Sequence, residues 1–274
     1  MSLEALLRRD RRVSLAALGV VLALAWGWLL AGAGMDMPAD AAAMPGMAAM
    51  EAMEGMGDMP GMAAPAWSWR YALLMFAMWW GMMLAMMLPS AAPVILLVAA
   101  LNRRVRPQRP PYGAAAGFAA GYLLAWGAFS VLATAAQWWL GTQGLLDGLL
   151  RSELAALSGG LLLAAGAWQL APAKRACLRH CRSPLDLLTR QRQRRRGSVW
   201  LGMAHGGYCL GCCWLLMALL FVGGLMNLYW IVGLSLYAMA EKLLPASPWL
   251  ERLGGVVLLS WGGAVLAGWA WPAA

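Results

Sequence analysis

Residues 71–101 read YALLMFAMWWGMMLAMMLPSAAPVILLVAAL, a long stretch without a single charged side chain. The hydrocarbon core of a bilayer is roughly 30 Å thick, and a helix crosses it with roughly 20 residues. Within that core the backbone must satisfy its own hydrogen bonds, which helices do within one segment. The stretch therefore predicts a transmembrane helix, and it sets the fold class of the chain.

Similar apolar runs recur along the 274 residues, of which 62% are hydrophobic and 12% charged. This composition is typical of a polytopic membrane protein. We place spans near 13–33, 71–101, 112–140, 154–171, 200–223, 225–244 and 253–271. The predicted fold is all-α, a transmembrane helix bundle of about seven spans. Residues 1–33 form the amino terminus and first anchor, 34–69 a disordered Met-rich outer loop, and 70–274 a six-helix membrane domain with an Arg/Cys-rich loop at 172–199.

The basic residues predict the orientation. Of 21 Lys and Arg residues, only Arg70 and Arg151 fall on one side of an alternating seven-span arrangement. The positive-inside rule then places the amino terminus in the cytoplasm and the carboxyl terminus in the periplasm, in a bacterial inner membrane. The net charge of +9 follows from this topology, so the expected partners are the lipid bilayer and not nucleic acid. A signal peptide cleaved near residues 31–33 is an alternative to the first span and would leave six.

The outer loop carries a regular methionine pattern, MPGMAAMEAMEGMGDMPGM, at residues 44–62. A period of three matches one turn of polyproline II or a 3₁₀ helix. Thioether sulfur is a soft, uncharged ligand that favours Cu(I), and the acidic residues between the methionines would attract cations. The alternative is a linker that cannot fold alone. The predicted metal-capturing residues are Met44, Met47, Met50, Met53, Met56, Met59 and Met62.

The second span continues the methionine pattern into the membrane. At 100° per residue, one narrow stripe forms, and it descends from the outer loop towards Pro89, where we expect a kink. Methionine is also a common core filler, so a packing face is the alternative. The predicted relay residues are Met75, Met78, Met82, Met83, Met86 and Met87.

All five cysteines and both histidines lie between residues 177 and 213. The first cluster, CLRHC, follows the fourth span, and the second, HGGYCLGCC, lies early in the fifth. On a helix the four Cys and His residues of the second cluster project within an arc of about 100°. Arginines near the first cluster would favour thiolate, the form that binds metal. We predict metal ligands at Cys177, His180, Cys181, His205, Cys209, Cys212 and Cys213.

Glu241 lies near the inner end of the sixth span, at a depth similar to that of His205. It could orient the imidazole from outside the ligand set. A carboxylate that reaches interfacial water beside Lys242 is the alternative. The chain has no P-loop, since neither of its two lysines follows a glycine, and no Ser/His/Asp arrangement, so we predict no enzyme activity.

The segments WWGMMLAMMLPSAAP, GYLLAW, KRACLRHCRSP, HGGYCLGCCWLLMALLFVGGLMNLYW and EKLLP resemble a bacterial family of unknown function, whose members are predicted to be metal-binding integral membrane proteins. The resemblance covers roughly residues 75–245. It implies a multi-pass helical inner-membrane protein with a metal site at the Cys and His residues of both clusters. The methionine loop lies outside it.

These features together predict a Cu(I)-handling membrane protein, and other soft metals share the same preference for sulfur. The loop would capture the ion, the stripe would relay it, and the Cys/His cluster would hold it, with a periplasmic or membrane metalloprotein as a further partner. One alternative is a membrane thiol–disulfide oxidoreductase that uses Cys209 and Cys212. Another is an assembly factor for a metalloenzyme.

Overall fold

The computed structural model describes residues 3–31, 67–105, 112–146, 154–182, 197–244 and 248–269, together with 108, 110 and 150–152. The helices there are α1 (Leu3–Leu30), α4 (Trp69–Val105), α5 (Tyr112–Thr142), α6 (Ala155–Leu170), α7 (Pro172–Arg182), α9 (Ser198–Ala218), α10 (Leu220–Gly223), α11 (Leu228–Leu243) and α12 (Pro248–Leu266). The described residues contain no strand, apart from an isolated bridge between Leu146 and Ser152. The predicted all-α bundle is confirmed.

Four helical segments are long and apolar enough to cross a membrane, namely residues 7–30, 69–105, 112–142 and 198–223. The bent pair α6–α7 is a fifth candidate. The number of spans is therefore approximate, and lower by this criterion than the seven expected. The runs expected at 225–244 and 253–271 are largely helical, but α11 has only 16 residues and α12 carries Glu251 and Arg252 in its first turns.

The chain turns sharply where the fourth expected span ends, and residues 172–182, expected in the loop 172–199, form a further helix. Helices α6 and α7 meet at 66° across Ala171, whose backbone is extended (φ −67°, ψ 137°). The cause is Pro172, because a proline ring disfavours helical geometry at the residue before it and is well tolerated at the first position of a new helix. The turn brings α7 against α9, so that the two cysteine clusters are neighbours.

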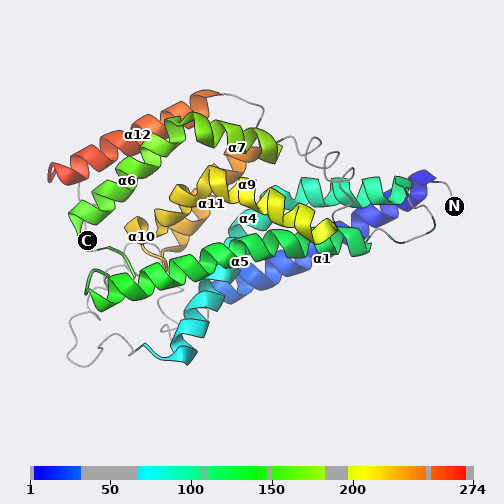
Figure 1. Cartoon of the computed structure of the whole chain (residues 1–274), viewed down its shortest axis with the longest axis horizontal. Coiled ribbons are helices and arrows are strands. Elements are labelled where there is room, and N and C mark those ends of the chain that lie inside the picture. The colour runs from blue at the N-terminus through cyan, green and yellow to red at the C-terminus, as the bar shows by residue number, and fades with distance from the viewer. Residues whose placement is uncertain are drawn as a thin grey trace.

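The helices run in alternating directions, and Figure 1 places the first residues of α1, α5 and α9 at the same end of the bundle. Helices α5 and α9 pack very closely. A Cβ atom added at Gly121 would meet the backbone of Val199, and one added at Gly202 would meet the backbone of Phe118. Small residues allow such contact between membrane helices. The backbones of the two helices are therefore in direct contact, and α9 carries the second cysteine cluster.

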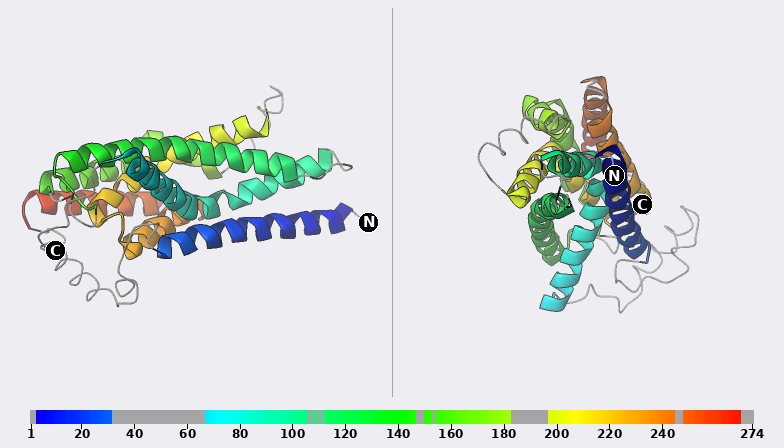
Figure 2. Two further views of the ribbon diagram at one scale, coloured as in Figure 1. Left: turned by 90° about the horizontal axis from the view of Figure 1, so that it is seen from below. Right: turned by 90° about the vertical axis from the view of Figure 1, so that its right-hand side faces the viewer.

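Helix α6 packs against α12 through a second set of glycines. A Cβ atom at Gly159 or Gly166 would meet leucines and a glycine carbonyl of α12, and Gly255 and Gly262 are equally crowded from the other side. These glycines therefore allow α6 and α12 to approach each other closely. Two orthogonal views show the layered arrangement of the bundle (Figure 2).

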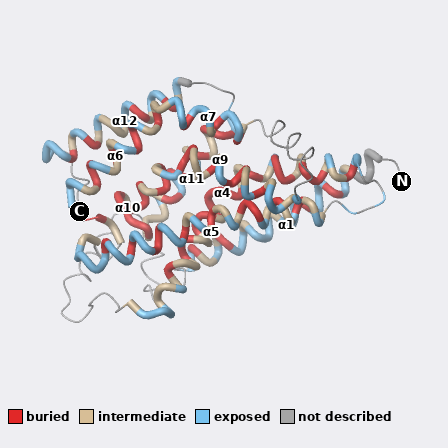
Figure 3. Tube along the Cα trace, in the orientation of Figure 1, coloured by how far each residue is buried: buried red, intermediate tan, exposed pale blue. Residues whose placement is uncertain are grey.

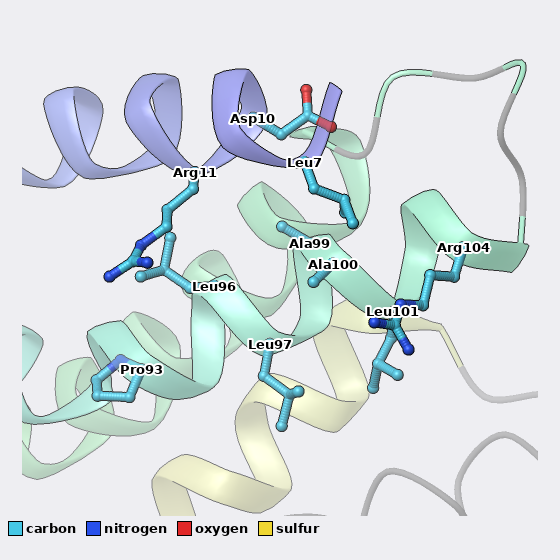
Figure 4. A pocket seen from close by; sticks show the side chains of 10 residues that line it. All are labelled: Leu7, Asp10, Arg11, Pro93, Leu96, Leu97, Ala99, Ala100, Leu101 and Arg104. Carbon is cyan, nitrogen blue, oxygen red and sulfur yellow. The ribbon is translucent and has the colours of Figure 1, made fainter. Parts of the chain in front are cut away.

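Buried residues concentrate where α4, α5, α9 and α11 meet (Figure 3). A separate cavity of about 480 Å³ lies between α1 and α4 (Figure 4). Leucine and alanine side chains line it together with Arg11 and Arg104, and nearby Asp10 accepts a 2.6 Å hydrogen bond from Arg103. Its lining contains no sulfur or imidazole, so the predicted metal chemistry belongs to the other half of the bundle.

Candidate metal centre

The methionine stripe of α4 faces the interior of the bundle. Its six side chains are each at most 2% exposed: Met75, Met78, Met82, Met83, Met86 and Met87. At the Met75 end, the Gln137 amide donates a 3.1 Å hydrogen bond to Met75 Sδ, and Trp79 Nε1 donates to the Gln137 carbonyl oxygen at 2.8 Å. The six side chains therefore form a buried column along α4, a set that fits core packing and also supplies soft donors.

Helix α4 contains Pro89 and Pro93 just beyond this column. Proline lacks the backbone donor of an ordinary helical residue, which weakens the helix locally. The Met87 carbonyl there accepts hydrogen bonds from Ser90 Oγ at 2.8 Å and from the Tyr122 hydroxyl at 3.2 Å. Figure 2 shows that α4 changes direction partway along its length. The Met87 end of the stripe is thereby held against α5.

The predicted face of the fifth span is buried as a unit. His205, Cys209, Cys212 and Cys213 are each at most 2% exposed. The thiols of Cys212 and Cys213 both donate to the Cys209 carbonyl at 3.0 Å, so they bond within their own helix. The Cys209 sulfur instead lies 3.0 Å from the Tyr122 hydroxyl of α5. Cys209 therefore contacts hydrogen-bonding groups of α5 and α11, whereas Cys212 approaches Cys181 of α7.

A small cavity of about 70 Å³ opens beside Cys209. One water needs roughly 10–15 Å³ measured in this way, so the cavity has room for a small ion with its ligands. Five helices contribute to its lining, which consists of Ser90, Pro93, Val94, Tyr122, Cys181, Arg182, His205, Cys209, Lys242 and Leu243. Cys181, His205 and Cys209 are the predicted ligands that reach it.

Lys242 is the main feature of this cavity that the sequence reasoning missed. Its ammonium donates hydrogen bonds to Cys209 Sγ at 3.0 Å, Met87 Sδ at 3.1 Å and Ser90 Oγ at 3.4 Å. The residue is 8% exposed. The sequence predicts Lys242 only as one of the basic residues that set the orientation, whereas its side chain points inward and lies between Met87 and Cys209.

The remaining predicted ligands lie around the cavity at different distances. Cys181 Sγ is 4.0 Å from Cys212 Sγ, across the contact between α7 and α9. Cys177 packs against Gly211, where an added Cβ atom would lie 3.0 Å from its sulfur. The exposed His180 ring stacks on Tyr208 with a centroid distance of 4.4 Å. Neither Cys177 nor His180 lines the cavity.

Glu241 has a different partner from the one expected. Its carboxylate accepts hydrogen bonds of 2.8 Å and 2.7 Å from Lys174, and both residues are buried. The buried His205 Nδ1 has no hydrogen-bond partner among the described residues, and the ring lies beside Phe118 and Tyr122. In this structure the carboxylate therefore neutralises a lysine rather than orienting the imidazole.

Within the described parts of the chain, no three Cys, His, Asp or Glu side chains are arranged so that they could hold one metal ion. The side chains that meet beside Cys209 include the Met87 thioether and the Lys242 ammonium, which are not among these four residue types. The methionines predicted to capture metal, Met44–Met62, lie outside the described residues.

Residues 76–265 match the PpoB2 family, which is described as a copper chaperone. The chain belongs to the PpoB2 copper chaperone family. Copper handling is therefore its functional class, in agreement with the metal-binding membrane family that the sequence resembles. The match includes most of the stripe, the cavity and both cysteine clusters, and it leaves out α1 and the outer methionine loop. No curated protein and no solved structure matches the chain.

Proposed function

We propose that this protein passes Cu(I) along the buried methionine stripe of α4 to the cavity beside Cys209, and from there to a partner metalloprotein. Cu(I) prefers thioether and thiolate sulfur, and the column and cavity supply these in series. The outer loop at residues 34–69 would collect the ion, and the Arg-rich ends of the helices would lie in the cytoplasm.

One observation carries the proposal. Lys242 Nζ lies 3.1 Å from Met87 Sδ and 3.0 Å from Cys209 Sγ, so the two sulfurs are within about 6 Å of each other. The last methionine of the stripe and the first cysteine of the cavity are thus separated by a single side-chain group. An ion that leaves Met87 could reach Cys209 without crossing water or lipid.

The surroundings suit an uncharged product. Moving a lone ion into an apolar interior is very costly, whereas a Cu(I)–thiolate pair has no net charge. Tyr122 adds a hydroxyl at 3.0 Å that could stabilise the sulfur. The Met87 and Cys209 sulfurs suit Cu(I), whereas magnesium prefers oxygen ligands and would not be favoured here.

Metal loading of the purified full chain in lipid nanodiscs tests the proposal. We expect Cu(I), supplied anaerobically, to be retained while Zn²⁺ is not. A Met82→Leu/Met86→Leu/Met87→Leu variant should load severalfold more slowly, since thioethers are absent from the route. Met217→Leu is the matched control, because Met217 is equally buried but lies on α9, outside the stripe.

Replacement of the seven loop methionines by leucine should slow loading only when copper is scarce. Equal retention of Zn²⁺, or unchanged loading of the triple variant, would contradict the relay. Loss of loading in Met217→Leu would indicate that packing and not ligation is being measured.

A further inference from the structure

The three hydrogen bonds of Lys242 match the three hydrogens of an ammonium group. Two of the acceptors are sulfur atoms, from Met87 and Cys209, and the third is the Ser90 hydroxyl. A thioether and a thiolate around one small cation of single positive charge are also the donors that Cu(I) prefers. The ammonium therefore lies at the point between these sulfurs where a copper ion would be bound.

No carboxylate competes for this lysine within the described residues. The nearest acid in the chain, Glu241, bonds to Lys174, and Glu251 lies 3.4 Å from Arg182. A buried cation is stable only with a compensating partner, and among the three contacts only Cys209 can carry a negative charge. The Lys242–Cys209 pair thus has the same formal charge as a Cu(I)–thiolate pair.

We propose that Lys242 is a tethered cation that occupies the Met87–Cys209 position when copper is absent and exchanges with Cu(I) when copper arrives. This inference rests on the proposed function and concerns how the same site is loaded and emptied. The net charge of the interior stays unchanged because, as Cu(I) enters, the displaced ammonium moves out to water at the end of α11, beside the exposed Leu243 and Leu244. The ion therefore enters and leaves without exposing a bare thiolate to an apolar environment.

The geometry makes the two cations mutually exclusive. Metal–sulfur bonds are about 2.3 Å long, whereas the ammonium contacts are 3.0 Å and 3.1 Å, so each sulfur would move inward by about 0.7 Å. No space remains between them for the amine. Lys242 lies in the last turn of α11 on a flexible four-carbon stem, and the adjacent cavity of about 70 Å³ gives it room to move.

Because Lys242 competes with Cu(I) for the same sulfurs, we expect copper to bind less tightly than it would to these ligands without the lysine. Lys242→Leu removes the cation without adding a ligand, and we expect its Cu(I) dissociation constant to fall at least tenfold in competition with a colorimetric Cu(I) chelator. Lys242→Arg keeps the positive charge and should not gain affinity. The gain should disappear in Lys242→Leu/Cys209→Ser, which locates it at this site.

A second measurement uses the wild-type chain and needs no substitution. The chain has two lysines, so acylation by an amine-specific reagent can be mapped to each. Cu(I) should raise labelling of Lys242 severalfold, because the displaced amine leaves its sulfur contacts. Lys174, held by Glu241, is the internal reference and should not change.

The outcomes separate the two proposals. Two results together would overturn the exchange and leave the relay intact. Lys242→Leu would bind copper no more tightly than the wild-type chain, and Cys209→Ser would still weaken binding. Unchanged Lys242 labelling in copper-loaded protein would do the same. If Cys209→Ser binds copper as tightly as the wild-type chain, both the exchange and the relay are overturned.

Discussion

The chain contains two lysines, and both are buried a short distance apart on neighbouring helices. Lys174 meets the two oxygens of Glu241, whereas Lys242, the next residue after that glutamate, meets two sulfurs and a hydroxyl. Carboxylate oxygen is a hard partner that suits an ammonium permanently, and sulfur is a poor partner that suits a soft metal better. The first contact therefore holds helices together, and the second can be given up.

The largest expected effect comes from breaking the permanent pair. Glu241→Gln leaves the Lys174 charge buried without a partner, and such a loss costs about 3–5 kcal/mol of the free energy of unfolding. Thermal unfolding in detergent should show this clearly. Lys174→Leu/Glu241→Leu should regain most of the stability, because no lone charge remains. If Lys242→Leu proves as destabilising as Glu241→Gln, the two lysines do not differ as we suggest.

Removal of the thiolate should have the largest effect on copper. We expect Cys209→Ser to weaken Cu(I) binding about 100-fold, equivalent to roughly 3 kcal/mol. Cys177→Ser is the matched control, since Cys177 belongs to the same predicted ligand set but lies outside the cavity. Binding would be measured by chelator competition, with thermal unfolding to verify the fold. Equal losses in both variants would favour the full cysteine set over the cavity.

Removal of the thioether should have a smaller effect. Met87→Leu keeps the size and shape of the side chain but not the sulfur, and a neutral ligand contributes less than a thiolate. We expect about tenfold weaker Cu(I) binding, roughly 1.4 kcal/mol. Met217→Leu should change affinity less than about twofold. X-ray absorption at the copper edge of the copper-loaded protein would report whether the number of sulfur ligands falls by one.

The smallest expected effect is on the redox state of the cysteines. Cu(I) needs thiolates, and the predicted cytoplasmic-side placement of the cysteines favours reduction. In growing cells that are acid-quenched and alkylated at once, Cys209 and Cys212 should be almost wholly reduced, with or without residues 35–62. A substantial disulfide that involves Cys212, with Cys209 or with Cys181 at 4.0 Å, would favour the oxidoreductase alternative.

Much of this architecture could be read from hydrophobic pattern alone. The 71–101 run predicts its helix because charges are absent, and the spacing of four, seven and eight residues from His205 to Cys213 places that set on one buried face. The fourth span expected at 154–171 ends where Pro172 begins a new helix, but residues 172–182, expected in a loop, form α7.

The partners of single polar side chains could not be predicted in the same way. Whether Lys242 reaches the interface or the interior depends on where Met87 lies, and these residues are 155 positions apart in the chain. The sequence predicts that Glu241 orients His205 or reaches interfacial water, whereas its carboxylate pairs with Lys174. Periodicity identifies the face of a helix, but only the packing of several helices decides which groups meet there.

The contact between α5 and α9 has a consequence for inherited variation. Gly121 and Gly202 lie against the backbone of the opposite helix. They are close in sequence to Tyr122 and His205, which line the cavity. A methyl group at either position would push the helices apart and shift the hydroxyl away from Cys209. A genetic screen for cells defective in copper supply should therefore recover alanine or serine at these two glycines, far more often than at Gly207, where an added methyl group meets nothing within 4 Å.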